Sequence, residues 1–331
     1  MAQRIRTFDR AGTLIKELSG PALCEWIIND IGSASFVSKA AGLEPYVRYG
    51  NYITVEHDNG LPDFVGVITT PRPWSSKTIT VNAKSAMWLF AQRVGSYEQP
   101  VSGSFGEVIT QVIGIVNAAE STILQIGTYD SGISYSSVVD MSNVYTYLQR
   151  ALAQSNTRLD FRPVFSNGKL TIYIDMQPTL YTPSNLKLEE GLNLKKNSLI
   201  LLEQGDIYND VTILGVGLDQ TKYMGWKEDP VSISLYGRRQ VLFSEGTSQS
   251  DVDRLATVRL SQYAYPRNTL GLVALNVNNT FSNIREGYSG PVKLFSEGYL
   301  NNGLGFEGTA YIKSIIYDGR TKEANLVCLE V

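Results

Sequence analysis

The spacing of apolar residues predicts short strands over the first 82 residues. Apolar and polar side chains alternate with a period of two, which is typical of strands that bury one face. The segments with this alternation are Ile5–Phe8, Leu14–Leu18, Ala22–Ile28, Ser35–Ser38, Tyr52–His57, Phe64–Thr69 and Thr78–Asn82. Residues 84–94 are predicted to form a helix that closes one end of this β-region.

The spacing changes to that of helices after residue 98. Ser104 and Glu107 form a capping box, in which the two side chains satisfy free amides at a helix start. A second helix is predicted after Ser142, and then a hairpin that turns at Ser166-Asn167-Gly168. The first helix carries an apolar stripe of Phe105, Val108, Ile109, Val112, Ile113 and Val116, the second one of Val144, Leu148, Ala151 and Leu152, and the hairpin strands are Leu159–Phe165 and Lys169–Asp175.

From about residue 197 the pattern is again mainly that of strands. A helix is predicted from Ser248 or Ser250 to about Tyr263, and Pro266 ends it. The predicted strands of this part are Leu199–Glu203, Val211–Val216, Val231–Tyr236 and Leu270–Val277.

One β-pattern occurs twice, around residues 46–82 and around residues 288–331. Both copies have three alternating segments, with Gly and Asn turns at Asn59-Gly60 and at Asn301-Asn302-Gly303. We expect two related β-units, with Tyr52–Val55 equivalent to Val292–Phe295 and Phe64–Ile68 equivalent to Tyr311–Ile315. The alternative is a chance similarity between two antiparallel meanders. A duplicated β-unit favours a ring or tube subunit over a catalytic cleft.

These patterns divide the chain into three predicted domains. Residues 1–97 and 197–331 form two β-domains, the second with one helix, and residues 98–196 form an α+β insertion between them. The length of 331 residues allows about two or more domains with sizeable cores. The fold class is therefore mainly β with a smaller α/β region.

Composition argues against a nucleic-acid-binding face. Charged residues make up 18% of the chain, below the usual quarter, and the net charge is −3. Affinity for nucleic acid comes mostly from clustered Lys and Arg, which this balance does not favour. The amino-terminal residues contain no apolar signal segment and no run approaches 18 apolar residues, so we expect a protein made in the cytoplasm without a membrane span.

Candidate catalytic residues are few. His57 is the only histidine, so a Ser-His-Asp triad, a histidine-containing zinc site or a histidine base would all require it. It stands between Glu56 and Asp58 at a predicted strand end, where we expect a solvated surface side chain. The acidic pairs Glu189-Glu190 and Glu228-Asp229 could serve as hydrolytic carboxylates, but solvated loop residues are the simpler interpretation. We therefore predict no catalytic, cofactor-binding or metal-binding residues.

The remaining candidates also have structural interpretations. Asp58-Asn59-Gly60 and Asp318-Gly319 lack the rest of a calcium-binding loop and are predicted to be hairpin turns. Cys24 and Cys328 are the only cysteines, and we expect two small buried side chains rather than a disulfide framework. A set of tyrosines could stack on sugars, but such residues more often fill sheet faces or protein interfaces; they are Tyr129, Tyr135, Tyr145, Tyr147, Tyr181 and Tyr208.

Several segments together resemble the tail hub proteins of long-tailed bacteriophages. Residues 22–36 resemble the family's first strand with a Trp, its turn and the next strand, and residues 231–239 resemble its later Tyr-Gly-Arg signature. The segments 64–68, 78–81 and 89–94 are similar to further strands and a helix of that family. The chain differs in having Ile31 where the family often has Pro, and Ala83 and Ser85 where a Gly-x-Asp pair is usual.

The resemblance implies a structural protein with two tail-tube-like antiparallel β-barrels. A homotrimer would then present six tube-like units, continue a hexameric tail tube and line the channel for genome ejection. The implied partners are a tail tube or distal tail protein above, tail-tip, spike or fibre proteins below, and the tape measure protein. The implied location is the virion, at the tail tip or baseplate. Two alternatives are a receptor- or carbohydrate-binding tail-tip protein and a tail-associated cell-wall hydrolase.

Overall fold

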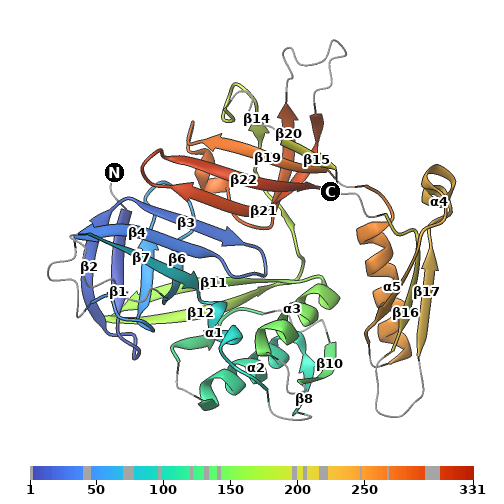
Figure 1. The fold of residues 1–331 in the computed structure, drawn as a ribbon, viewed down its shortest axis with the longest axis horizontal. Coiled ribbons are helices and arrows are strands. Elements are labelled where there is room, and N and C mark those ends of the chain that lie inside the picture. Colours follow the sequence, from blue (N-terminus) through green and yellow to red (C-terminus); the bar gives the residue numbers. More distant parts are fainter. Residues whose placement is uncertain are drawn as a thin grey trace.

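Most strands join one large sheet (Figure 1). The computed structural model describes residues 3–39, 46–69, 78–95, 99–119, 122–129, 134–139, 143–195, 200–203, 207–215, 223–246, 248–266, 268–294 and 306–331. Within these residues, fourteen strands form this sheet, with the main order β15-β19-β22-β21-β3-β4-β7-β6-β5-β1-β2. They are β1 (Gln3–Phe8), β2 (Leu14–Gly20), β3 (Ala22–Ile27), β4 (Ser33–Lys39), β5 (Tyr52–Glu56), β6 (Phe64–Ile68), β7 (Thr78–Ser85), β13 (Thr182–Pro183), β14 (Leu188–Glu189), β15 (Ile200–Glu203), β19 (Asn268–Leu275), β20 (Tyr288–Leu294), β21 (Phe306–Asp318) and β22 (Glu323–Glu330).

The two β-regions predicted from the sequence meet where β3 pairs with β21. The pairing is antiparallel and runs from Ile27 opposite Ser314 to Leu23 opposite Asp318. Each of the two predicted meanders is present, because β5, β6 and β7 pair in chain order, and so do β20, β21 and β22. The expected mainly β fold is confirmed, and most of its strands lie in one large, mainly antiparallel sheet. The predicted turn at residues 301–303 lies outside the described residues.

Strict alternation gives the middle of this sheet one buried face. In β3, β4, β7, β19 and β22 alternate side chains are buried, and β21 alternates only after a register shift that follows Ile312. These side chains join a core from both β-regions that includes Trp26, Phe36, Ile315 and Leu326. Strands β5 and β6 are buried on both faces. Phe64 and Ile68 contribute to this core, whereas Val65 and Val67 pack in a second core with the helices. The two sides of β6 therefore connect the large sheet to the α+β region.

The α+β region lies against this second face of β5 and β6. It contains a two-stranded sheet, β10-β8, and a three-stranded sheet, β11-β12-β9. Its elements are α1 (Trp88–Ala91), β8 (Gln99–Ser104), α2 (Phe105–Ala119), β9 (Leu124–Ile126), β10 (Ser134–Val139), α3 (Val144–Ser155), β11 (Arg158–Ser166) and β12 (Lys169–Gln177).

The predicted capping box is confirmed at the start of α2. Glu107 Oε2 accepts hydrogen bonds from the backbone nitrogen of Ser104 at 2.7 Å and from its hydroxyl at 2.9 Å. In return Glu107 N donates to Ser104 Oγ at 3.4 Å. The predicted apolar stripe is buried along its whole length; it comprises Phe105, Val108, Ile109, Val112, Ile113 and Val116.

The second helix and the hairpin of this region also form as predicted. Asn143 caps α3, since its side chain accepts from Tyr145 N at 2.9 Å, while Ser142 lies outside the described residues. The β11–β12 hairpin turns at Asn167 and Gly168, which both have positive φ angles of 51° and 75°. Two successive residues with positive φ are the requirement of a type I′ turn.

The predicted helix over residues 84–94 is mostly wrong. Lys84 and Ser85 continue β7, where they pair with Val67 and Gly66 of β6. Helix begins only at Trp88 and ends at Ala91. Pairing across the sheet satisfies the backbone of residues 84 and 85, and this outweighs a local helical preference.

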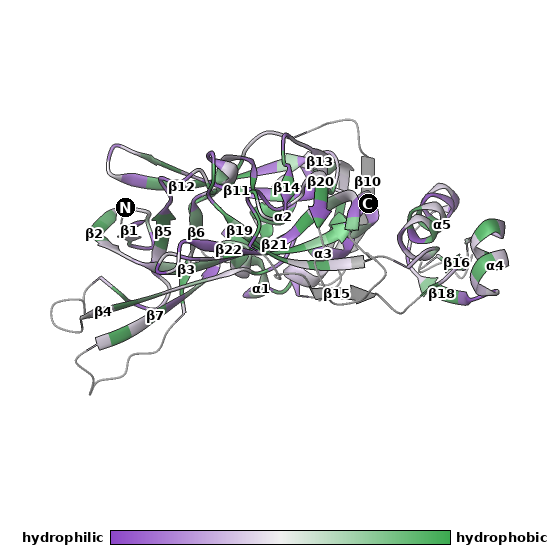
Figure 2. Cartoon of the chain, turned by 90° about the horizontal axis from the view of Figure 1, so that it is seen from above, coloured by the Kyte–Doolittle hydropathy of each residue, from purple (hydrophilic) through white to green (hydrophobic). Residues whose placement is uncertain are grey.

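A small unit lies at one side of the molecule, at the right of Figures 1 and 2, and contacts the α+β region where Arg254 donates to Gln154 O. Its three-stranded sheet, in the order β17-β16-β18, packs against α5 around Val211, Ile213, Val252 and Leu255. The elements are β16 (Asp210–Leu214), β17 (Met224–Glu228), α4 (Pro230–Tyr236), β18 (Gln240–Ser244) and α5 (Gln249–Tyr263), and a short 3-10 helix, η1 (Thr280–Asn283), follows in the main body. Ser248 caps α5, as predicted.

The predicted strand over Val231–Tyr236 is wrong, because this segment is helix α4. Asp229 accepts a hydrogen bond from Ser232 N at 2.9 Å, and Pro230 occupies the first turn, where its missing N–H costs nothing. Serines at every second position imitate the alternation of a strand. Val231 and Leu235, four residues apart, are both exposed, at 63% and 64%.

Candidate functional site: a buried junction and the open face of the sheet

The expected surface position of His57 is wrong. The residue is 9% exposed, and its ring lies edge-on to Trp26 at 5.3 Å and to Tyr317 at 5.5 Å between centroids. Gln3 uses Oε1 to accept from Ala22 N, so its nitrogen donates to His57 Nε2 at 2.7 Å. Burial lowers the pKa of His57 to about 4. A neutral ring held in this way by Gln3 has a structural role.

The acidic candidates are tied to structural partners. Glu228 forms an ion pair with Arg238 at 2.8 Å, and Asp229 caps α4. Glu189 lies 3.7 Å from Lys187. Glu190 is the residue after β14, and its backbone nitrogen donates to Lys293 O at 3.0 Å. Glu189-Glu190 lies in the main body and Glu228-Asp229 in the small unit, so the two acidic pairs do not come together in one site.

The predicted turns and buried cysteines are confirmed. Asp58-Asn59-Gly60 connects β5 to β6, with Asn59 Oδ1 accepting from Leu61 N, and Asp318-Gly319 begins the turn between β21 and β22. Cys24 and Cys328 are free and buried, and burial raises the pKa of both thiols. Among the residues described, no group of three or more His, Cys, Asp and Glu side chains could hold a metal ion. No helix in the described ranges is both long and apolar enough for a membrane crossing.

The candidate tyrosines whose side chains the structure describes do not form one sugar-binding surface. Tyr147 is buried in the core around the helices. Tyr181 stacks on Tyr311, with centroids 5.1 Å apart, whereas Tyr208 packs against Tyr263 in the small unit. Tyr129 is exposed at 45%, and Tyr145 donates to Asp30. The strand that contains Tyr135 is β10.

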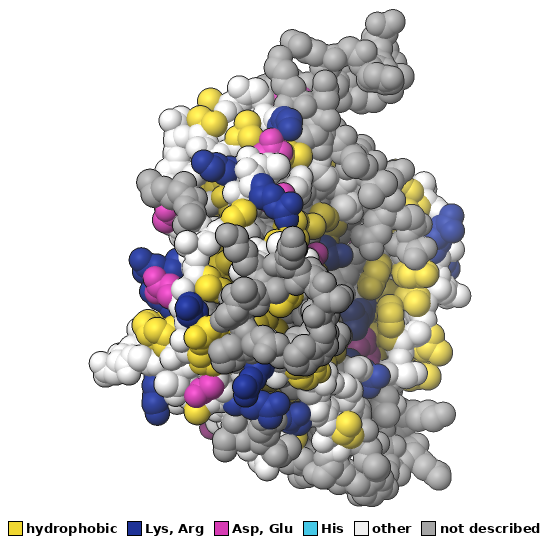
Figure 3. Space-filling view, turned by 60° about the vertical axis from the view of Figure 1, so that its left-hand side comes forward, with side chains coloured by type: hydrophobic (Ala, Val, Ile, Leu, Met, Phe, Trp, Pro, Cys, Tyr) yellow, Lys and Arg dark blue, Asp and Glu magenta, His cyan; other side chains and the backbone are white. Residues whose placement is uncertain are grey.

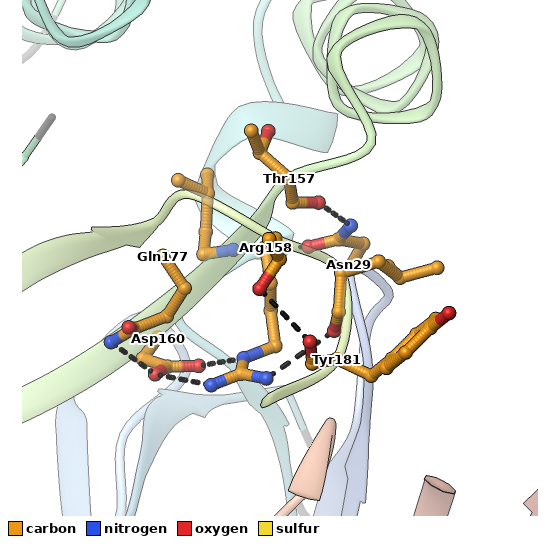
Figure 4. A network of polar contacts seen from close by, with 9 residues as sticks. Asn29, Thr157, Arg158, Asp160, Gln177 and Tyr181 are labelled. Carbon is orange, nitrogen blue, oxygen red and sulfur yellow. Dashed lines mark hydrogen bonds and ion pairs between the residues drawn. The ribbon is translucent and has the colours of Figure 1, made fainter. Parts of the chain in front are cut away.

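The most developed polar site is a junction that sequence reasoning missed (Figure 4). It joins the β3–β4 turn to the start of β11. Asn29 donates to Thr157 O at 2.8 Å and accepts from Leu159 N at 3.0 Å. Asn29 has φ of 53°, a left-handed conformation that Asn tolerates better than most residues. A single amide side chain thereby fixes the large sheet to the α+β region.

Arg158 is the largest buried side chain at this junction, with 2% exposure. Its guanidinium binds both oxygens of Asp160, at 2.8 and 3.3 Å, and donates to Leu180 O at 3.3 Å. Gln177 donates to the same Asp160 carboxylate at 3.0 Å. Gly287 has φ of +76°, and a Cβ there would lie 1.8 Å from Arg158 Nη1. The glycine is therefore required by both its conformation and the arginine beside it.

The open face of the large sheet is the second candidate site. Because β7 and β4 alternate, their outward side chains form rows across the sheet, with Lys84 opposite Ser33 and Asn82 opposite Ser35. Thr78 and Thr80 extend the hydroxyl-bearing surface along β7. On the side of the molecule shown in Figure 3, Lys and Arg side chains lie at several separate places among polar and hydrophobic ones. Such a surface offers little attraction for phosphate.

The fold is similar to those of three solved tail proteins, two of them from prophages. They are the prophage tail protein gp18 from Listeria monocytogenes (TM-score 0.64, 10% identity, 98% of this chain and 94% of that one), the prophage MuSo2 43 kDa tail protein from Shewanella oneidensis (0.61, 15%, 98% and 98%) and the tail protein from Neisseria meningitidis MC58 (0.65, 12%, 99% and 96%). The sequence matches no protein-family model and no curated protein sequence. The chain thus has the fold of these tail proteins along nearly its whole length, as the resemblance of its sequence predicted.

Proposed function

We propose that this protein is a structural tail hub, a homotrimeric ring at the distal end of a phage tail tube. The observation that carries the proposal is the single sheet that unites two antiparallel meanders and has the fold of tail proteins. Residues 1–97 and 197–331 would supply the two tube-like units, with residues 98–196 as the insertion. Three copies would then present six units to a hexameric tube.

The open face of β4 and β7 would line the ejection channel. Most of its outward side chains are Ser, Thr and Asn, which bind water and carry no charge, with Lys84 and the apolar Val37 beside them, so DNA would be held only weakly. The ring would contact a tail tube or distal tail protein above it and tail-tip, spike or fibre proteins below it, with the tape measure protein inside. The protein would act in the virion and would not be an enzyme.

Exposed apolar residues on the small unit support a role in assembly. Met224, Trp226 and Leu242 are exposed at 58%, 49% and 58%. Trp226 and Leu242 both lie opposite Thr212, so they share the sheet face away from α5. Asp210 accepts a hydrogen bond from Trp226 Nε1 at 2.8 Å and holds the exposed ring in one orientation. Exposed apolar patches of this kind mark protein contacts.

Counting copies in purified tails tests the ring. Three copies of the 36.6 kDa chain per tail are expected by quantitative mass spectrometry. Six or twelve copies at the tube end would point to a tube or distal tail protein instead. Binding of the purified chain to receptor sugars, or cell-wall lysis by it, would favour the two alternatives.

A charge placed on the open face tests the channel. The variant Thr80→Lys should leave tail number and shape unchanged but slow DNA release, because it adds another lysine to a face that already carries Lys84, and lysines bind passing phosphates. Thr80→Gln, which adds length without charge, is the matched control. Equal infectivity of the two variants would show that this face does not line the channel.

A further inference from the structure

A small cavity lies where the large sheet meets the α+β region. Its volume is about 40 Å³, and its walls include Trp26, Asp30, Asp63, Leu159 and Glu286. A water molecule needs roughly 10–15 Å³ of such volume and several polar partners. Organic ligands need several hundred Å³, so water is the molecule that fits.

Two of the wall residues each carry a buried side-chain atom without a partner among the described residues, namely Trp26 Nε1 and Glu286 Oε2. Trp26 as a whole is 8% exposed. A buried indole N–H normally donates a hydrogen bond, and a buried carboxyl oxygen normally takes part in one. The pair therefore offers one donor and one carboxyl group to a molecule in the cavity.

The other acids of the cavity are already bonded. Glu25 accepts from Ser33 Oγ at 2.8 Å, and Asp63 accepts from His57 N at 3.0 Å. Asp30 accepts from Ile31 N at 2.6 Å and from the hydroxyl of Tyr145. His57, packed on Trp26, is neutral above its pKa of about 4. None of these groups supplies a positive charge to Glu286.

The charges beside Glu286 act in both directions: Asp160 disfavours its ionised form, whereas Arg158 and Arg285 favour that form more weakly. Arg158 is the buried cation at this place, but Asp160 already binds it through both oxygens. Arg285, the neighbouring residue, is exposed. A second carboxylate next to Asp160 would lack a counter-ion of its own, which favours keeping the proton.

We propose that this cavity binds water between Trp26 Nε1 and Glu286 Oε2, and that Glu286 carries a proton there, so that the junction weakens when the proton is lost. Burial, followed by the negative charge of Asp160, raises the pKa of Glu286 to about 7. A carboxyl whose pKa is raised by folding contributes stability below its unfolded pKa of about 4.5, and this contribution is lost as pH rises through 7.

Urea unfolding of the full chain between pH 5 and pH 8.5 tests the proton. Relative to wild type, the folding constant of Glu286→Gln should rise with pH by up to about a hundredfold and level off above pH 7. Glu307→Gln, which alters an exposed carboxylate paired with Lys293, should show no such rise. If the ratio of the folding constant of Glu286→Gln to that of wild type were the same at every pH, the proposal would be overturned. If Glu286→Gln does not fold, the infrared absorption band of a protonated carboxyl in the wild type provides the test. Loss of this band near pH 7 would support the proposal. Absence of the band at pH 5.5 would contradict it.

The variant Trp26→Phe tests the water. Phenylalanine keeps an aromatic ring in the core but lacks the indole N–H. In the wild type this N–H would stabilise the ionised carboxyl of Glu286 through the water. The pH at which Glu286 titrates should therefore move upward in this variant. An unchanged titration in Trp26→Phe would show that water does not link the two groups.

Discussion

Gln3 donates a hydrogen bond to His57 Nε2 at 2.7 Å across a separation of 54 residues, and so requires the unprotonated form of that nitrogen. A proton on Nε2 would face the amide nitrogen of Gln3. Because the opposite end of the amide accepts from Ala22 N, the amide cannot turn round without losing that bond. The geometry and the burial of His57 favour the same neutral state.

Acid should therefore weaken the fold through His57. Its pKa is lowered to about 4, so its contribution to stability is present above pH 6.5 and is lost as pH falls through 4. The contribution amounts to at most about 3 kcal/mol, from 1.36 kcal/mol per pKa unit. In urea unfolding, His57→Gln should lose less stability than wild type between pH 6.5 and pH 4. Parallel pH profiles of the two proteins would contradict this.

Gly287→Ala should destabilise the protein by about 2–5 kcal/mol, because it combines a left-handed conformation with overpacking against Arg158. Gly191→Ala is the matched control, since its φ of +80° is similar but a Cβ there meets nothing within 4 Å. The control should cost only about 1–2 kcal/mol. Equal costs in chemical unfolding would mean that Arg158 moves away freely.

Ser104→Ala should cost about 1 kcal/mol, because α2 loses the hydroxyl that accepts from Glu107 N. Ser102→Ala, on the exposed side of the same strand, should change stability by less than about 0.5 kcal/mol. Urea midpoints of both variants measure the difference. A loss with Ser102→Ala as large as that with Ser104→Ala would place the effect in β8 and not in the helix cap.

Trp26→Ala should cost about 3–5 kcal/mol, since the side chain is 8% exposed and packs on His57 and Phe64. Against a typical stability of 5–15 kcal/mol, this loss should reduce the yield of assembled tails. Trp26→Phe should retain most of the stability at pH 5.5. Unfolding curves and tail counts for both variants check the prediction.

Local patterns in the sequence predicted most strands and helix starts. The alternation along β3, β7 and β22 reports one buried face directly, and the Ser104–Glu107 spacing is a local motif with a local hydrogen-bond pattern. Helix α4 was missed because serines at alternate positions imitate a strand, although Asp229-Pro230 is a recognisable helix start. In that segment the capping signal is more informative than the period.

The junction could not be predicted, because its contacts join distant parts of the chain. Asn29 and Leu159 are 130 residues apart in the sequence, and nothing local indicates that an Asn in a turn will bond to a later strand. From the sequence alone, an arginine beside the predicted strand Leu159–Phe165 would be expected at the surface. The burial of Arg158 depends on its contact with Gly287, which is far away in the sequence. His57 was misplaced for the same reason, since its partner Gln3 lies on another strand.

The pairing of β3 with β21 also has a consequence during synthesis. Residues 23–27 find their partners only at residues 314–318, almost the whole chain later. Until β21 emerges from the ribosome, β3 presents unpaired amides and carbonyls along one side, although its other neighbour β4 is already available. Open strand edges of this kind recruit other strands, so crowded nascent chains risk aggregation through this one edge. The late arrival of β21 closes the edge and makes the two ends of the chain interdependent in folding.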